Sequence, residues 1–568
     1  MFFALLSAAA MGRASAAVEP RASGDPNRPN VVLIQTDDQD LESLRARFRD
    51  PWDRVRRAMP KTLDLIASQG IEFTGYYVSH PICAPSRAAL LSGQYAHTSG
   101  FKRNSGPEGG WQGWKNLPIM NENLAVALDR AGYRTAHIGK FTNNYVGENP
   151  NQEVETRVPP GWDHWYVPAY SNTLYYYGTR LNLNGNPIGP LGSNSYDLWG
   201  GETDPPECTA ANLLDPVPGV ACNHSTDLFS RNAVEQIEAS GEDPFYIQVD
   251  YNTPHGDHRS PIGPQPLSRH YDSALKASVP RPPGYNEADT TDKPSFIREV
   301  PPMTRSEIES TDTRWRKEIE ALRGVDDGVG AIVEALRRTG KLENTYIFFT
   351  SDNGQFMGQH RLGSAKFLPH EPASRVPLLV RGPGIKPGSR SSELTANIDI
   401  APTILSLTGA KLPHGFDGRS LRPFWKKPGK RTRRPILLES YIGPNDVPAD
   451  ATPPEGAGAS ASAPPRNYFG LRAGRYKYIE YTNGERELYD LKIDPAELSN
   501  RIANPAWRKI ASRLSAELAI RKTCKGAACR AETGPLPLPP YVKPKPKPKP
   551  KTAKEKRSRA AKVKVGSR

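Results

Sequence analysis

Residues 80–87 read H-P-I-C-A-P-S-R and bring a thiol, a guanidinium group and two prolines into eight positions. The prolines disfavour a helix before Pro85 but allow one to begin there, so we expect Cys83 to lie just ahead of a helix. Backbone N–H groups at a helix start favour an anion, and Arg87, one turn on, can turn towards the same place. The spacing therefore predicts an anion site beside a thiol, whereas the commonest fate of a lone cysteine is a buried structural thiol.

Two short apolar runs, at 31–34 and 346–350, each lead into oxygen-bearing side chains. Such runs are typical of buried parallel strands, and ligand groups gather where these strands end. Neighbouring acids there repel each other unless a cation or a proton intervenes. Oxygen donors without soft ligands select Ca²⁺ or Mg²⁺ over zinc or copper, although each acidic pair alone could be a solvated turn. The candidate ligands are Asp37, Asp38, Asp352 and Asn353.

Three more polar residues stand near expected strands. Lys140 follows Gly139 after a strand-like run at 133–138, and His255 comes shortly after the apolar run 245–249. Lys366 precedes a further apolar run in the segment 376–384. A lysine at a strand end is usually solvated, and most of the eleven histidines must be structural or on the surface, so residue type alone does not select these three.

The pattern C-x-P-S-R at Cys83–Arg87 resembles the signature of sulfatases, in which a formylglycine-generating enzyme oxidises the cysteine to formylglycine. Segments 139–145, 253–258 and 358–384 look most like the glucosamine-6-sulfatase branch. The usual histidine two residues after the Gly-Lys pair is Thr142 here. The resemblance implies a sulfuric ester hydrolase, with a sulfated sugar such as N-acetylglucosamine 6-sulfate as substrate.

In this family the hydrate of formylglycine is the nucleophile, which attacks the sulfur of a sulfate monoester. The resemblance implies that His255 protonates the departing alcohol and that the remaining cations bind the sulfuryl oxygens. The implied catalytic residues are Cys83, Arg87 and His255, the substrate ligands are Lys140 and Lys366, and the ligands of Ca²⁺, or of Mg²⁺, are Asp37, Asp38, Cys83, Asp352 and Asn353.

A chain of 568 residues exceeds one ordinary core. The resemblance implies an α/β fold, with a large alkaline-phosphatase-like mixed sheet sandwiched by helices and a smaller C-terminal antiparallel sheet plus helix. Helical patterns occur at 124–131, 319–336 and 507–518, and Asn483-Gly484 indicates a hairpin. We read 151–223 as a loop-rich insertion that shapes the substrate cleft. The expected divisions are a signal peptide at 1–17, a catalytic domain at 28–425, a C-terminal subdomain at 435–530 and a disordered Lys-Pro tail at 535–568.

The formal net charge of +14 is concentrated in the tail, because residues 541–568 hold twelve Lys or Arg and one Glu. The rest of the chain carries only +3, so a nucleic-acid enzyme is not indicated. A Lys-Pro repeat cannot build a core, so we expect a solvated tail that contacts, at most, polyanions or the cell surface. We also expect that removing 535–568 leaves turnover of a small aryl sulfate unchanged.

The first 17 residues have the apolar core and small-residue end of a signal peptide, although without its basic start, and the sequence leaves open whether the true start lies upstream. We therefore expect a secreted or periplasmic protein, and no apolar stretch is long enough to span a bilayer. Four cysteines besides Cys83 are closely spaced in two pairs without zinc-site partners. We predict the bridges Cys208–Cys222 and Cys524–Cys529.

Two other functions stay open from the sequence. The same fold could act as a phosphate or phosphonate monoester hydrolase, which side-by-side assays of sulfate and phosphate esters would distinguish. Alternatively the chain could be a non-enzymatic secreted protein that binds polyanions through its basic tail. The four predicted metal ligands argue against the second alternative, because anion binding alone does not need a metal beneath a nucleophile.

Overall fold

The computed structural model describes residues 28–145, 156–169, 175–191, 224–257, 260, 262–441 and 467–540. The expected signal peptide, the Cys208–Cys222 pair and the tail from 541 onward lie outside the described residues. Within the described part, no helix is both long enough and apolar enough to cross a membrane.

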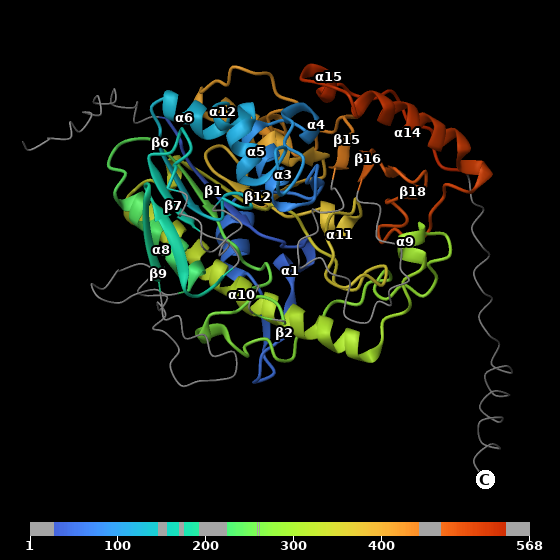
Figure 1. Ribbon diagram of the computed structural model, residues 1–568, viewed down its shortest axis with the longest axis horizontal. Coiled ribbons are helices and arrows are strands. Elements are labelled where there is room, and N and C mark those ends of the chain that lie inside the picture. The colour runs from blue at the N-terminus through green and yellow to red at the C-terminus, as the bar shows by residue number, and fades with distance from the viewer. Residues whose placement is uncertain are drawn as a thin grey trace, which may run out of the picture.

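A ten-stranded mixed sheet forms the centre of the molecule (Figure 1). Strands β11, β1, β10, β6 and β7 run parallel to one another, whereas β12 is antiparallel to β11, and β8 and β9 continue antiparallel at the other edge. In sheet order the strands are β13 (Ser389–Ser391), β4 (Ile71–Phe73), β12 (Leu378–Arg381), β11 (Thr345–Ser351), β1 (Asn30–Thr36), β10 (Phe245–Asp250), β6 (Arg134–Gly139), β7 (His164–Pro168), β8 (Thr179–Leu183) and β9 (Asn186–Leu191). The predicted large mixed sheet is confirmed.

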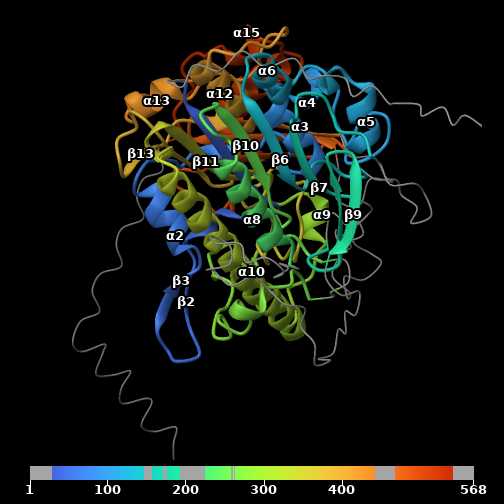
Figure 2. The ribbon, with the colours of Figure 1, turned by 90° about the vertical axis from the view of Figure 1, so that its left-hand side faces the viewer.

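Helices cover both faces of this sheet, as expected for strands that are apolar throughout. Val32 and Ile34 of β1 pack into the core beneath α8 (Ser225–Glu238) and α10 (Arg305–Arg338). Val31 and Leu33 point the other way, into a second core formed with α3 (Cys83–Ser92), α6 (Leu124–Arg130) and α12 (Ile400–Thr408). Figures 1 and 2 show the two helical layers on opposite sides of the sheet.

Short elements connect these layers. They are α1 (Leu41–Arg45), β2 (Arg47–Arg49), β3 (Val55–Arg57), α2 (Pro60–Thr62), a π-helical turn (Leu63–Ala67), β5 (Tyr76–Tyr77), α4 (Ala96–Ser99), α5 (Gly110–Asn116), α9 (Ser295–Arg298), α11 (Glu371–Ser374), β14 (Thr395–Ala396), α13 (Arg422–Lys426) and the 3-10 turns Pro118–Met120, Ser268–His270, Leu342–Asn344, Asn397–Asp399 and Pro505–Trp507.

Two sequence expectations are corrected. The helix expected at 319–336 begins at Arg305, where a capping box between Thr304 and Glu307 starts it; the first half lacks a continuous apolar stripe and so gave no periodic signal. The segment 151–223, expected to be loop-rich, contributes β7, β8 and β9 to the main sheet. The alternation of polar and apolar residues in these short strands is weak. Pairing with neighbouring strands, and not their own residue pattern, therefore makes them strands.

A separate four-stranded antiparallel sheet follows near the C-terminus (Figure 1), and its strands are β15 (Ile436–Tyr441), β16 (Asn467–Ala473), β17 (Tyr476–Tyr481) and β18 (Arg486–Asp490). Helix α14 (Arg508–Arg521) packs on β16 and β17 and is followed by α15 (Ala527–Arg530). The hairpin predicted around Asn483-Gly484 joins β17 to β18, and the predicted Cys524–Cys529 disulfide is present. Tyr77 and Phe356, which precede this sheet in the chain, share its hydrophobic core.

The described chain continues past the expected start of the tail at 535. Tyr476 donates a hydrogen bond from its hydroxyl to the carbonyl of Pro537 (2.7 Å), and Leu536 packs against the core of the C-terminal sheet. Leu536 and Pro537 therefore belong with that sheet, and the expectation that the tail stands apart from residue 535 onward is wrong for these two residues. Their sequence, P-L-P-L-P-P, supplies apolar side chains that the Lys-Pro repeat lacks.

Candidate active site

The carboxyl ends of β1, β11, β10 and β6 meet at one edge of the sheet because all four strands are parallel. The chain keeps this alignment beyond the strands: Asp352 N–H donates to the Thr36 carbonyl and Asp37 N–H to the Thr253 carbonyl. The residues that follow each strand therefore face a common point. All nine residues that the sequence identified as candidates are buried around it.

Asp38, Asp352 and Asn353 form the part of the site that joins β1 to β11. Asp38 has a φ of 67°, a left-handed conformation that aspartate tolerates better than most residues. Its N–H donates to Asp352 Oδ1 (3.1 Å), and Asn353 Nδ2 donates to Asp38 Oδ1 (2.6 Å). Burial, and next the Asp37 charge, raise the pKa of Asp352 to about 6.

Cys83 is the first residue of α3, not a residue ahead of it, and this corrects the sequence expectation. Pro85 sits in the first turn, where backbone N–H groups have no helical partner, so the helix can begin two residues before it. Cys83 Sγ lies 3.6 Å from Asp37 Oδ1 and 3.6 Å from Lys366 Nζ. Burial raises the pKa of the thiol to about 12, although both nearby lysines oppose this.

Arg87 links three of the acids through a guanidinium group that is almost completely buried. Its nitrogens lie 2.8 Å from Asp352 Oδ2, 3.2 Å from Asp250 Oδ2 and 3.7 Å from Asp37 Oδ2. Burial alone would lower the pKa of Arg87, but these carboxylates raise it above its usual value. Arg87 therefore stays charged and holds the strand ends together.

Asp250, the last residue of β10, is a site residue that sequence reasoning missed. Gln248 Nε2 donates to Asp250 Oδ2 (2.8 Å) beside the Arg87 contact, and Tyr246 donates to Gln248 Oε1 (2.7 Å). Burial raises the pKa of Asp250 to about 7 against the pull of Arg87. The sequence does indicate Asp250, because this acid ends a third apolar run of the strand type. It has no acid or amide directly beside it, unlike Asp38 or Asn353, so the pattern did not single it out as a ligand.

Both predicted substrate-binding lysines contact the acids. Gly139 has a φ of 97° and passes so close to the Asp250 carbonyl that a side chain would clash, so only glycine lets Lys140 turn inward. Lys140 forms an ion pair with Asp37, and Lys366 Nζ lies 2.9 and 3.0 Å from the two carboxylate oxygens of Asp38. Burial would raise the pKa of Asp37, but Lys140 above all, with His255 and Arg87, holds it well below its usual range.

His255 completes the group from the loop after β10. Its Nε2 lies 3.6 Å from Asp38 Oδ2, and its Nδ1 lies 2.9 Å from the Gly256 carbonyl, which fixes Nδ1 as the protonated nitrogen in the neutral ring. Nε2 is then the nitrogen turned towards the cluster. The structure thus brings Cys83, Arg87, Lys140, His255 and Lys366 together with the acids.

The donor set fits a hard divalent cation. Ligand atoms of Asp37, Asp38, Cys83 and His255 all lie within 4.8 Å of one another. Asn353 Oδ1 is buried and, among the described residues, receives no hydrogen bond. The amide nitrogen of the same side chain donates to Asp38 and to the Gly354 carbonyl, so the side chain is oriented by these bonds while its oxygen faces the candidate cation site. An orphaned amide oxygen beside carboxylates is the kind of ligand that Ca²⁺ and Mg²⁺ accept.

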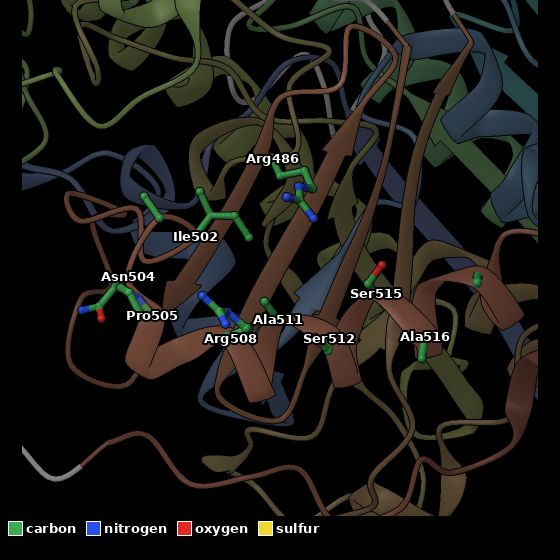
Figure 3. A pocket seen from close by; sticks show the side chains of 11 residues that line it. Arg486, Ile502, Asn504, Pro505, Arg508, Ala511, Ser512, Ser515 and Ala516 are labelled. Atoms are coloured by element: carbon green, nitrogen blue, oxygen red, sulfur yellow. The ribbon is translucent and has the colours of Figure 1, made fainter.

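A surface cleft of about 570 Å³ lies elsewhere, along α14 from Arg508 to Ala519 (Figure 3). Arg486, Arg508 and Ser515 line it, and Figure 3 shows side chains of β18 and α14 on its walls. None of its lining residues belongs to the buried cluster. Size alone does not identify an active site, and the convergent charged groups place the chemistry at the sheet edge.

We expect Cys83 in protein made without a maturation enzyme to react very slowly with iodoacetamide at pH 8. The thiolate is the reactive form, and a pKa raised to about 12 leaves little of it until the pH approaches that value. Labelling should accelerate as pH rises and should be fast at pH 8 in guanidinium, which gives the control. Peptide mass spectrometry would follow the reaction at position 83; rapid labelling of the folded, metal-free protein at pH 8 would contradict the burial of this thiol.

Comparison with known proteins agrees with this geometry. The family described as Sulfatase matches residues 29–410, and the family described as N-sulphoglucosamine sulphohydrolase, C-terminal, matches residues 460–523. The N-acetylglucosamine-6-sulfatase of Homo sapiens is 32% identical over 523 residues, which cover 89% of this chain and 86% of the relative.

Two solved structures share the fold. One is a protein in complex with its substrate D-glucosamine-2-N,6-O-disulfate, with a TM-score of 0.65 and 23% identity over 87% of this chain and 98% of the other. The second is the phosphonate monoester hydrolase of Agrobacterium radiobacter, with a TM-score of 0.60 and 21% identity over 87% of this chain and 95% of the other. The family match across the main sheet and the human relative's identity over most of both chains show that this chain belongs to the sulfatase family.

Proposed function

We propose that this protein hydrolyses sulfate monoesters and that residue 83, as formylglycine, supplies the nucleophile. The observation that carries the proposal is the position of Cys83: its Sγ lies between Asp37 and Lys366 at the start of α3, with Arg87 and Lys140 in the same buried cluster. Since burial raises the thiol pKa to about 12, an unmodified Cys83 would be a poor nucleophile at neutral pH. Conversion by a formylglycine-generating enzyme would give an aldehyde instead, and the addition of water to this aldehyde would supply the hydroxyl.

We further propose Ca²⁺ as the ion that the site holds, with Mg²⁺ as the alternative. Asp37, Asp38, Asp352, Asn353 and the modified residue 83 would be its ligands. Bound there, the ion would supply positive charge that lowers the pKa of the hydrate's hydroxyl and offsets charge on the ester. Four protein oxygen side chains suit the six to eight oxygen ligands of Ca²⁺ better than the water-rich octahedron of Mg²⁺.

The chain's own residues would divide the remaining work. Lys140 and Lys366 would exchange part of their contact with the carboxylates for the sulfuryl oxygens, and they stabilise charge that develops there. Arg87 would hold the start of α3 against the strand ends and add its charge. His255 would donate a proton from Nε2 to the departing alcohol, and this requires the imidazolium form at the moment of transfer. The sulfated hydrate would then return to the aldehyde: its second hydroxyl would pass its proton to His255, which is neutral after the first transfer, and the C–O bond to the sulfate group would break so that sulfate leaves with the bonding electrons.

For the substrate we propose a 6-sulfated amino sugar such as N-acetylglucosamine 6-sulfate. Support comes from the human N-acetylglucosamine-6-sulfatase and from the C-terminal family match, both of which concern sulfated glucosamine by name. The fold similarity to a phosphonate monoester hydrolase keeps phosphate and phosphonate esters as the second candidate class.

We also propose that the protein is exported, as its N-terminal sequence indicates, and that the basic segment 541–568 contacts polyanions at low salt. Retention on a heparin column, with and without this segment, would measure the second proposal. A segment that made no difference at any ionic strength would have no such role.

The first prediction concerns maturation. Coexpression with a formylglycine-generating enzyme should replace sulfur and two hydrogens by one oxygen in the peptide that contains residue 83. Cys83→Ala should fold normally, because alanine fits the helix start, but should lose roughly a thousandfold or more of turnover. Mass spectrometry and an aryl sulfate assay check both points, and full activity with an intact thiol would refute the mechanism.

The second prediction concerns the metal. Adding Ca²⁺ to chelator-treated protein should raise the melting temperature by mass action, and by more than Mg²⁺ does at equal concentration. Asn353→Leu should reduce this shift because it removes the orphaned oxygen. Asp64→Asn, which alters only an exposed pair with Arg57, should keep the full shift as a control. An equal shift in the wild type and in Asn353→Leu would remove Asn353 from the ligand set.

The third prediction concerns substrate class. The matured enzyme should hydrolyse a chromogenic aryl sulfate and, among sulfated monosaccharides, N-acetylglucosamine 6-sulfate best, and should act on matched phosphate esters more slowly. Initial rates on this panel give the comparison. Turnover of the aryl sulfate alone would refute the sugar assignment only, whereas faster hydrolysis of phosphate esters would refute sulfate ester hydrolysis as the main activity.

A further inference from the structure

Lys477 is a fully buried lysine in the C-terminal sheet. Alternate side chains of β17 (Tyr476–Tyr481) point to opposite faces of the sheet. On one face, Tyr476 makes an edge-to-face contact with Trp507 beside α14. On the other, Lys477 and Tyr481 face the main domain, where Tyr481 makes an edge-to-face contact with Phe296. A lysine at an inward position of a strand is rare unless it is paired. Burial of the Lys477 charge therefore requires polar or charged partners, which the hydrophobic core does not provide.

The ammonium group of Lys477 reaches the segment 366–371, which carries a predicted sulfate ligand. Nζ donates to the Pro369 carbonyl (2.9 Å) and lies 2.8 Å from Glu371 Oε1. Glu497 fixes the arrangement from the C-terminal side: one of its oxygens lies 2.8 Å from Lys477 Nζ, and the other accepts the Glu371 N–H (2.9 Å). The buried charge of Lys477 thus ties the segment to the second sheet, together with His370, whose Nε2 lies 3.1 Å from Glu487 Oε2 of β18.

The same segment begins at Lys366, whose ammonium contacts Asp38 and Cys83. Next to it, Phe367 has a φ of 75°, a conformation that costs free energy for a non-glycine residue and persists only where neighbours impose it. Its N–H donates to the Pro81 carbonyl (3.1 Å) on the site side. Only two residues separate Lys366 from Pro369, so Lys477 holds the opposite end of the strained stretch.

The negative charge of Glu371 is maintained at neutral pH. Burial would raise the pKa of Glu371, but Lys477, together with Arg375 and Arg472, lowers it to about 2. Tyr77 also donates to Glu371 Oε1 (3.0 Å), which links the anchor to β5. Removing the ammonium would leave the buried Glu497, and Glu371, whose side chain is 15% exposed, without their shared partner.

We propose that Lys477 is a positioning residue for Lys366, so that recognition of the sulfate group at the edge of the main sheet depends on a side chain from the C-terminal sheet. This inference rests on the proposed function, because it takes Lys366 as a ligand of the sulfuryl group. It assigns the C-terminal sheet a part in catalysis although none of the nine predicted site residues lies in it.

A double-mutant cycle on the full-length matured enzyme tests this. Lys366→Ala, Lys477→Met and the double variant would be compared with the wild type on a chromogenic aryl sulfate. A misplacement of about 1 Å can cost about a hundredfold, so Lys477→Met should lower kcat/KM by about ten- to a hundredfold and weaken inhibition by inorganic sulfate. Because Lys477 acts through Lys366, the double variant should be no worse than Lys366→Ala alone.

Arg475→Met is the matched control. Arg475 pairs with Asp490 at the same end of the sheet (2.6 Å) and does not contact the segment 366–371, so this variant should lose stability without losing sulfate affinity. If Lys477→Met does not fold, Glu497→Gln takes its place in the cycle; it removes a charge that orients Lys477 while leaving a hydrogen-bonding amide, and it should show the same non-additivity with Lys366→Ala.

The outcomes distinguish failure of the proposed function from failure of the role of Lys477. Wild-type protein that hydrolyses no sulfate ester would overturn the proposed function and this inference with it. Loss of turnover in Lys366→Ala, with unchanged turnover in Lys477→Met, would overturn the inference alone. So would losses that multiply in the double variant, because independent losses indicate a general structural role.

Discussion

The site depends on one physical constraint: acids and bases that are buried together must neutralise each other. Asp37, Asp250 and Asp352 converge at the strand ends, and an unpaired carboxylate there would cost several kcal/mol. Arg87 contacts all three, and Lys140 pairs with Asp37. The cations that the reaction would direct at sulfate are therefore the same cations that make the folded acid cluster tolerable, so binding chemistry and stability cannot be altered separately.

The parallel centre of the sheet makes this convergence possible. Four neighbouring parallel strands deliver their carboxyl ends to one edge, and α3 presents its first turn to the same edge from the covering layer. The fold as such does not decide the reaction, since a phosphonate monoester hydrolase shares it at a TM-score of 0.60. The proposed reaction depends instead on which residues meet at this edge, above all Cys83 at the start of α3 and the cations around it.

Pairing of buried charges also links the C-terminal sheet to the main domain. It shares a hydrophobic core with Tyr77 and Phe356, and Lys477 carries a buried charge from it to the segment that bears Lys366. A lysine that were merely solvated could be exchanged freely. One that is fully buried between two glutamates fixes the relative position of the sheet and the segment, because any displacement would uncover charge in a low-dielectric interior.

The sequence by itself determined the elements whose signals are local. The signature at Cys83, the apolar runs that became β1 and β11, the Asn483-Gly484 hairpin and the Cys524–Cys529 bridge were all predictable, because a motif, a buried run or a turn is encoded within a few residues.

Only the tertiary structure decided the rest. It gave Arg87 its partner Asp250, made strands of the main sheet from 164–168, 179–183 and 186–191, packed Leu536 on the C-terminal sheet and brought Lys477 to Pro369. Each of these depends on a contact between segments far apart in the chain, and residue pattern within one segment carries no information about the charge or surface that it will meet.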